Sequence, residues 1–99
     1  MYNFSAWVQN TDPRFFQEDI KKLLLESGFG ICDFSEKFFE PFGYTCIFTL
    51  SESHLAVHTF PEEGASYIEL SSCVSLPFSR FCENFSKVAV LDENGLIDK

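Results

Sequence analysis

The chain has 99 residues, of which 15 are acidic and 7 are basic, so its formal net charge is −8 at pH 7. This length predicts one domain, residues 1–99. The negative charge repels phosphate backbones and anionic bilayers, which disfavours nucleic acid and membranes as partners. No apolar run approaches the roughly 20 residues of a membrane-spanning helix. The 13 phenylalanines can bury a large area from few positions.

The cysteines and histidines bear on compartment and metal binding. The first residues lack a basic stretch followed by an apolar one, so we expect no secretory signal. We therefore expect reduced thiols and a cytoplasmic location rather than a disulfide framework. The two histidines and the cysteines match no zinc spacing, so no metal is expected. The four cysteines are widely spaced and form no CxxC pair: Cys32, Cys46, Cys73 and Cys82.

The first part of the chain predicts a strand, a helix and a second strand. Tyr2–Gln9 has the aromatic and β-branched content of a strand. In the next segment Asp12 can cap a helix, Pro13 suits its first position, and Gly28 is placed to end it. Residues 29–38 predict the second strand. The helix has one apolar face, spaced at i, i+4, i+7 and i+8: Phe16, Ile20, Leu23 and Leu24.

The second part predicts three strands, a helix and a last strand. The strands are expected at 44–52, 54–60 and 66–73, after a turn in FEPFGY and with the turn PEEGA between the last two. They are too close together for helical crossovers, which favours an antiparallel meander. Residues 75–87 predict the helix, with an apolar face of Phe78, Phe81, Cys82 and Phe85. VAVLDE, residues 88–93, can return as the last strand.

This order of elements predicts an α+β fold, a two-layer sandwich with both helices on one face of an antiparallel sheet. The other face is then uncovered in a single chain. Because CIFTL and LAVHTF carry apolar residues toward both faces, we expect a second copy to cover it, most simply in a C2 homodimer.

The stretch ESHLAVHTFPEEG, residues 52–64, contains side chains that a purely structural strand does not need. Each one alone has an ordinary explanation. Ser53 is a hairpin serine, His58 a packed strand histidine and Glu62 a solvated turn residue. Cys73 alone would be a small buried hydrophobe. Only their combination indicates chemistry.

That combination resembles the bacterial-type S-adenosylmethionine decarboxylase proenzyme family. The motif of this family looks like E-S-H-x-x-x-H-T-aromatic-P-E-x-G, followed by an acidic residue and a cysteine, here Glu69 and Cys73. The resemblance is detailed from Phe39 to Cys73, and residue types fixed over so long a stretch make it specific. Upstream, four residues fall where the family has an aromatic residue, proline, glycine and serine: Phe39, Pro41, Gly43 and Thr45.

The resemblance implies a precursor that cleaves itself between Glu52 and Ser53 into chains 1–52 and 53–99. Ser53 would become a pyruvoyl group, which forms a Schiff base with the substrate amine and accepts electrons as carbon dioxide leaves. Thr45 would hydrogen-bond the cleavage intermediate, and His58 would take up a proton during β-elimination. Cys73 would reprotonate the decarboxylated substrate, a task that suits a thiol near neutrality.

The implied substrate is S-adenosylmethionine, whose decarboxylation supplies the aminopropyl donor for spermidine synthesis. Glu62 would bind the ribose hydroxyls, and Phe39 would stack on adenine near the sulfonium. Two alternatives stay open. One is the same chemistry on arginine or ornithine, and the other is a regulatory paralogue that does not cleave itself. They follow from departures from the family pattern at Thr45, Glu63, Ala65 and Val74.

Strand alternation adds a geometric requirement. Ser53 and His58 are five residues apart, so in a regular strand they face opposite sides. For both to act on one bond, we expect a bend or bulge at Ser53, or movement of Ser53 once the chain is cut.

Overall fold

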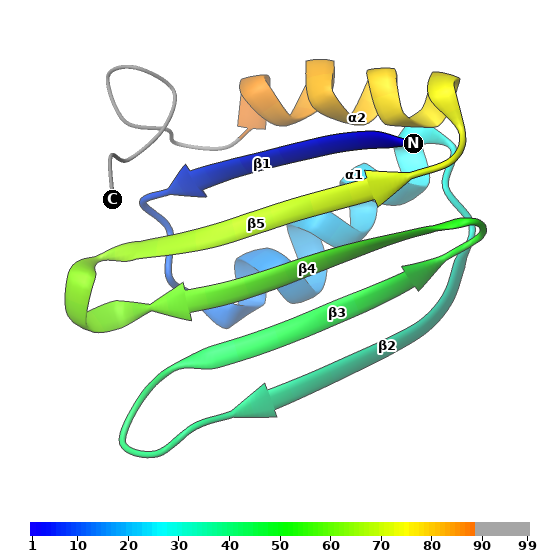
Figure 1. Cartoon of the computed structure of the whole chain (residues 1–99). Coiled ribbons are helices and arrows are strands. Elements are labelled where there is room, and N and C mark those ends of the chain that lie inside the picture. Colours follow the sequence, from blue (N-terminus) through cyan, green and yellow to red (C-terminus); the bar gives the residue numbers. More distant parts are fainter. Residues whose placement is uncertain (89–99) are drawn as a thin grey trace.

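The computed structural model describes residues 1–88, which form a five-stranded antiparallel sheet with helices on one face (Figure 1). The strand order is β1-β5-β4-β3-β2. The expected α+β sandwich and meander are therefore confirmed. The last predicted strand begins at Val88, the final residue of the second helix, and otherwise lies outside the described residues. The strands are β1 (Tyr2–Val8), β2 (Ile31–Phe38), β3 (Tyr44–Leu50), β4 (Ser53–Phe60) and β5 (Ala65–Ser72).

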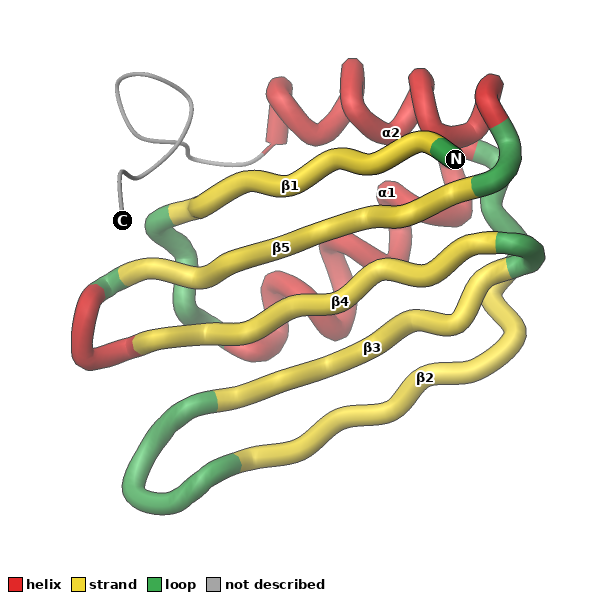
Figure 2. The backbone as a smooth tube through the Cα atoms, in the orientation of Figure 1, coloured by secondary structure: helices red, strands yellow, loops and turns green. Residues whose placement is uncertain are grey.

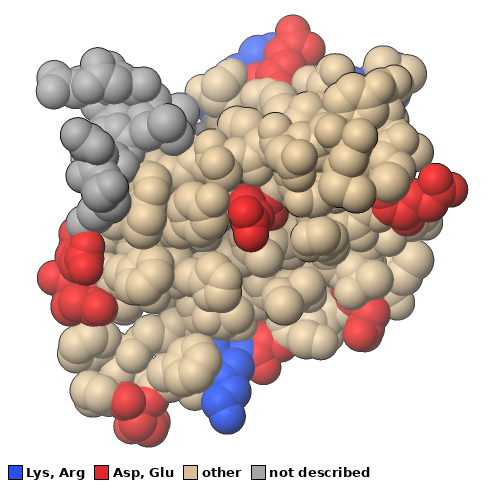
Figure 3. Space-filling model, in the orientation of Figure 1, with Lys and Arg blue, Asp and Glu red and all other residues tan. Residues whose placement is uncertain are grey.

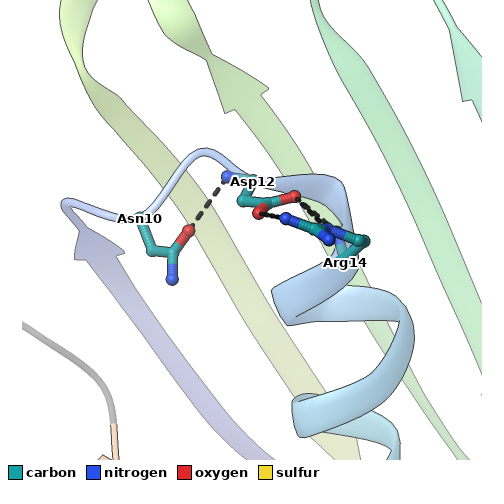
Figure 4. A network of polar contacts seen from close by, with 3 residues as sticks. All are labelled: Asn10, Asp12 and Arg14. Atoms are coloured by element: carbon teal, nitrogen blue, oxygen red, sulfur yellow. Dashed lines mark hydrogen bonds and ion pairs between the residues drawn. The ribbon is translucent and has the colours of Figure 1, made fainter.

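The first helical segment begins at a turn made by three polar side chains (Figure 4). The Asp12 carboxylate accepts a hydrogen bond from the backbone N–H of Arg14 at 3.0 Å, which confirms the predicted cap. The Asn10 side chain accepts one from the N–H of Asp12 at 2.9 Å. The chain then forms a π-helical stretch, η1 (Phe15–Ile20), which continues into α1 (Lys21–Ser27). Gly28 ends the helix with a left-handed φ of 105°.

The core lies between the sheet and the two helices, which pack against the same sheet face (Figure 2). The second helix, α2 (Ser75–Val88), contributes Phe81 and Phe85, which are buried and stack with their ring centroids 5.6 Å apart. Phe4 of β1 meets both rings edge-on, at 6.3 and 5.4 Å. The apolar spacing predicted for this helix thus faces the core. None of the helices in residues 1–88 is long and apolar enough to cross a membrane.

The opposite sheet face carries no helix within residues 1–88. Charged side chains on this open face are few and scattered (Figure 3). The strand register places one residue from each strand in a row across it: Lys37, Thr45, His58, Tyr67 and Trp7. The Trp7 ring lies 5.2 Å from that of Tyr67. An aromatic, weakly charged sheet face is consistent with the expected second copy.

Candidate active site

A two-residue turn joins β3 to β4 and contains the bond that the sequence predicts to be cleaved. Leu50 pairs with Ser53, so the turn consists of Ser51 and Glu52. Glu52 has a φ of 58°, and it is the one residue other than glycine with positive φ in the part of the chain that the structure describes. A left-handed backbone costs a residue with a Cβ about 1–2 kcal/mol. Glu52, which contributes the carbonyl group of the Glu52–Ser53 peptide bond, is therefore strained.

The end of β5 lies beside the turn between β3 and β4 (Figure 1), and residues there bond to both sides of this peptide link. The backbone N–H of Cys73 donates a hydrogen bond to the carbonyl oxygen of Glu52 at 3.1 Å. The hydroxyl of Ser53 donates one to the hydroxyl of Ser72 at 2.8 Å. Cys73 is exposed and Ser53 is half-buried. Through these two hydrogen bonds, the segment that contains the predicted cysteine lies against the turn that contains the predicted serine.

A second group of predicted residues meets at the other end of the sheet. Thr45 and His58 are directly paired across β3 and β4. The Thr45 Oγ1 lies 3.0 Å from the His58 Nδ1, within hydrogen-bond distance. Both side chains point to the open face. The hydroxyl donates to Nδ1 when that nitrogen is unprotonated and accepts from it in the other tautomer.

A pocket of about 220 Å³ brings this pair together with the two predicted substrate-binding residues. Phe39 comes from the loop between β2 and β3, and Glu62 comes from η2 (Pro61–Glu63), the turn between β4 and β5. Ligand pockets usually measure about 300–1,000 Å³. One chain would therefore enclose a nucleoside only in part. The lining comprises Phe39, Phe42, Gly43, Tyr44, Thr45, His58, Thr59, Phe60 and Glu62.

Several lining residues were not singled out from the sequence. Thr59 is the clearest, because its hydroxyl is buried and has no hydrogen-bond partner among the described residues. Its signal was its place between His58 and Phe60 in the motif. Phe42 is half exposed and flanks Gly43, whose φ of 118° shapes the loop. Outside this pocket, Ser72, the residue directly before Cys73, was not singled out from the sequence either.

Tyr44 connects the wall of this pocket to the helical layer. Its hydroxyl donates to the Glu36 carboxylate at 2.6 Å, and the Gln17 side chain donates to the same oxygen at 2.9 Å. Burial, and then the bond to Glu36, raises the pKa of Tyr44 far above its usual value. The hydrogen bonds from Tyr44 and then Gln17 lower the pKa of Glu36. This network holds the loop end of β3 against η1.

The thiols differ in their surroundings. Cys46 is buried on β3, and this burial raises its pKa to about 11, so it remains a neutral, packed thiol. Cys73 is exposed beside the turn. Cys32 is also exposed, and its Sγ lies 3.7 Å from the Ser51 Oγ in the same turn. Two thiols therefore lie beside the turn, and Cys73 is the one that the motif indicates.

The two groups do not form one site within a single chain. β4 pairs with β3 from Ser53 to Thr59 and with β5 from Ser53 to Phe60, in both cases without a register shift, so the expected bend or bulge at Ser53 is wrong. The turn lies before Ser53 instead. Ser53 faces the helices and His58 the open face, about 16 Å apart along the strand.

The sequence model of the family described as S-adenosylmethionine decarboxylase matches residues 7–90. The chain is an α+β protein with helices on one face of its sheet. Its sequence motif spans the hairpin of β3 and β4, whose turn is hydrogen-bonded to the backbone of Cys73. With a match over most of its length, the chain belongs to the S-adenosylmethionine decarboxylase family. This confirms the resemblance read from the motif.

Individual relatives agree with this assignment. The S-adenosylmethionine decarboxylase proenzyme of Symbiobacterium thermophilum is 37% identical over 68 residues, which are 69% of this chain and 52% of the relative. The proenzyme 2 of Bacillus cereus is 43% identical over 62 residues, 63% of this chain and 50% of the relative. The matched part of this chain thus spans about half the length of these curated relatives.

A solved structure supports the fold. The crystal structure of the adenosylmethionine decarboxylase from Aquifex aeolicus superposes with a TM-score of 0.62 at 21% sequence identity. The match covers 86% of this chain and 76% of that one. At this level of identity the likeness shows the shared sandwich.

Proposed function

We propose that this chain is the precursor of a pyruvoyl-dependent S-adenosylmethionine decarboxylase, and that it cleaves itself between Glu52 and Ser53. The observation that carries the proposal is the hydrogen bond from the Cys73 N–H to the Glu52 carbonyl oxygen. It places the peptide bond at the motif serine beside the motif cysteine, directly after a backbone-strained residue. The products would be chains 1–52 and 53–99.

The residues around Ser53 fit a pyruvoyl group formed there. Such a group supplies a carbonyl that accepts electrons as carbon dioxide leaves the substrate. Cys73, adjacent and exposed, is proposed to return a proton to the substrate carbon. Thr45 and His58 are proposed to assist processing, Thr45 by hydrogen bonding and His58 by proton transfer.

The pocket supports a nucleoside as the ligand. Phe39 offers an aromatic ring 47% exposed, and the Glu62 carboxylate can accept hydrogen bonds from two ribose hydroxyls. An aromatic face also attracts a sulfonium cation. Arginine and ornithine need neither contact, so this pocket favours S-adenosylmethionine over those alternatives. The decarboxylated product is then an aminopropyl donor for spermidine synthesis.

A homodimer through the open sheet face would unite the two groups of residues. They lie at opposite ends of β4, one at the β3–β4 turn and the other at the β2–β3 loop and η2 (Figure 1). A two-fold axis perpendicular to the strands places the turn end of one copy near the pocket end of the other. Each site would then combine Ser53 and Cys73 of one copy with Thr45 and His58 of its partner. If instead one chain forms the whole site, the Ser53 end of β4 has to move away from the helices to reach His58.

Intact mass analysis under denaturing conditions tests the proposal. The active protein is expected to give two fragments, 1–52 and a chain that starts at residue 53 with a blocked N-terminus. Borohydride in the presence of S-adenosylmethionine should add mass to the second fragment only. An uncleaved chain would show a regulatory paralogue instead. Carbon dioxide release from arginine or ornithine, but not from S-adenosylmethionine, would overturn the substrate assignment.

The four cysteines are free thiols, which supports a reduced cytoplasmic setting for this reaction.

A further inference from the structure

We propose that residues Ser72 to Val74, which follow β5 into α2, form a processing clamp on the Glu52–Ser53 bond. In this clamp Ser72 is a positioning residue for the Ser53 hydroxyl, and the backbone N–H of Cys73 stabilises charge on the Glu52 carbonyl oxygen. The inference rests on the self-cleavage proposed above. It assigns roles to Ser72 and to a backbone group that the motif does not indicate.

Ser72 uses the full hydrogen-bonding capacity of its hydroxyl inside the protein. The side chain is completely buried. Its oxygen accepts from the Val74 N–H at 3.0 Å and donates to the Val74 carbonyl at 3.0 Å. A hydroxyl has one donor and two acceptor positions, so the position left is that of an acceptor. Ser53 fills it, at 2.8 Å.

This arrangement fixes the direction of the hydrogen bond between the two serines. Because Ser72 can only accept, Ser53 must donate. The lone pairs of the Ser53 oxygen, which have to attack the carbonyl carbon of Glu52, are not engaged by this bond. The bond also limits rotation of the Ser53 side chain, so its oxygen is held in one place relative to the preceding peptide.

The Cys73 N–H acts on the other atom that changes in this step. When the Ser53 oxygen attacks, a C–O bond forms and negative charge develops on the Glu52 carbonyl oxygen. A backbone donor already 3.1 Å from that oxygen is suited to stabilise the charge. The C–N bond then breaks, and the proton lost by the hydroxyl ends on the released amine. The amide becomes an ester with no other reagent consumed.

Ser72 does not serve as the base in this step. Its own proton points to the Val74 carbonyl, which is too weakly basic to take it. The side chain therefore orients the nucleophile and leaves proton transfer to other groups. A positioning role predicts that a replacement retaining a hydroxyl will restore processing.

Cleavage of freshly synthesised precursor tests the role of Ser72. Cell-free translation followed by gel time courses gives the rate for the natural chain and for Ser72→Ala, Ser72→Thr and Ser71→Ala. Ser71 is the matched control, because its hydroxyl faces the open side and donates to the Asn3 side chain at 2.8 Å. We expect Ser72→Ala to cleave about tenfold more slowly, the loss of one well-made hydrogen bond. Ser72→Thr should recover most of the rate, and Ser71→Ala should match the natural chain.

A second pair of variants tests the backbone donor independently. Cys73→Ala and Cys73→Pro both lack the thiol, but only proline lacks the N–H. Removal of one such donor typically slows a reaction about 100-fold or more, so we expect Cys73→Pro to cleave at least that much more slowly than Cys73→Ala. Melting temperatures, measured with Ser53→Ala added to keep each chain intact, will test whether every variant is folded at the assay temperature.

The outcomes separate this inference from the proposed function. If the natural chain stays intact, the proposed self-cleavage is wrong, and the clamp with it. If the natural chain cleaves while Ser72→Ala cleaves equally fast or faster, Ser72 does not position the nucleophile. Equal rates for the two Cys73 variants would remove the backbone donor from the mechanism. Should Ser72→Ala fail to fold, Ser72→Cys replaces it, because a thiol keeps the size of the side chain but is a much weaker hydrogen-bond partner. Cleavage of Ser72→Cys as fast as that of the natural chain would then contradict the role of Ser72.

Discussion

Ser53 and His58 lie on one continuous strand, β4, but point to opposite faces of the sheet. Ser53 is hydrogen-bonded to the buried Ser72 on the helix side, and His58 to Thr45 on the open side. If both act on the Glu52–Ser53 bond, either the Ser53 end of the strand moves or the histidine comes from a second copy. The second solution keeps the pairing of β4, and the partner's His58 would approach the Glu52–Ser53 bond from the turn end of the sheet.

A mixture of two inactive chains distinguishes these solutions. Ser53→Ala has no nucleophile and His58→Ala has no proton acceptor, so neither should process alone. In a mixed dimer with shared sites, the His58→Ala chain keeps its own Ser53 and receives His58 from its partner. We therefore expect a tagged His58→Ala chain to be cleaved when it is co-expressed with Ser53→Ala. An intact tagged chain in a purified mixed dimer would place both residues of the site in one copy.

Thr45 is expected to matter through its hydroxyl rather than its shape. Thr45→Val keeps the branched side chain but loses the contact with the His58 Nδ1. Processing should slow about tenfold or more, since a hydrogen bond to a reacting group is lost. Thr45→Ser, which restores the residue usual in the family, should process at least as fast as the natural chain. Cleavage time courses measure both, and a Val variant as fast as the Ser variant would contradict the role.

Cys73 is expected to separate cleavage from turnover. Cys73→Ala keeps the backbone N–H on the Glu52 carbonyl and loses only the thiol. The chain should therefore cleave, yet decarboxylate at least about 100-fold more slowly without its proton donor. Cys82→Ala is the control, because Cys82 is also a free thiol but lies on α2, whereas Cys32 contacts Ser51 in the turn. Normal turnover by the Cys73→Ala protein would mean that another group supplies the proton.

Much of the fold could be predicted from the sequence because its signals are local. The cap at Asp12, the glycine at position 28 and the apolar spacing of Phe81 and Phe85 each determine one boundary or one face. The π-helical winding of η1 was not predicted, since an amphipathic pattern does not distinguish it from an α-helix over so few residues.

The site was predicted less completely, because its geometry depends on pairing between strands. The motif identified Ser53 and Cys73 but not the contact between the Cys73 backbone and Glu52, which arises from the register of β4 and β5. Ser72 lacked a signal for the same reason, because a buried serine in a strand looks ordinary until its partner is known. The alternation rule correctly indicated that Ser53 and His58 diverge in a regular strand. The bend expected to reunite them is absent.

If the pocket lined by Phe39 and Glu62 binds the substrate as proposed, binding and chemistry can be altered separately. Glu62→Gln keeps the shape of the turn but removes the charge that would strengthen bonds to the ribose hydroxyls. We expect KM for S-adenosylmethionine to rise about tenfold with little change in kcat, since the contact is remote from the reacting carbon. Glu63→Gln is the matched control, as Glu63 is the next residue but does not line the pocket. An unchanged KM for Glu62→Gln would remove this residue from the binding site.

The contact between Glu36 and Tyr44 predicts a specific acid sensitivity. Hydrogen bonds from Tyr44 and then Gln17 lower the pKa of Glu36 below its ordinary value of 4.5, so the charged carboxylate favours the folded state. That contribution is present above about pH 4.5 and is lost as the pH falls through the lower folded value. With Ser53→Ala added to keep the chain whole, Glu36→Gln should lower the melting temperature most at neutral pH. The effect should be modest, because the carboxylate is solvent-exposed.

The difference between the two proteins should shrink on acidification, as Glu36 becomes protonated first in the unfolded chain and then, at lower pH, in the folded one. Tyr44→Phe provides the control, because it removes the largest cause of the shift while keeping a buried ring. In that background, Glu36→Gln should have a smaller and flatter effect across the same pH range. A difference that grows on acidification would contradict the sign of the shift, since the carboxylate would then favour the unfolded chain.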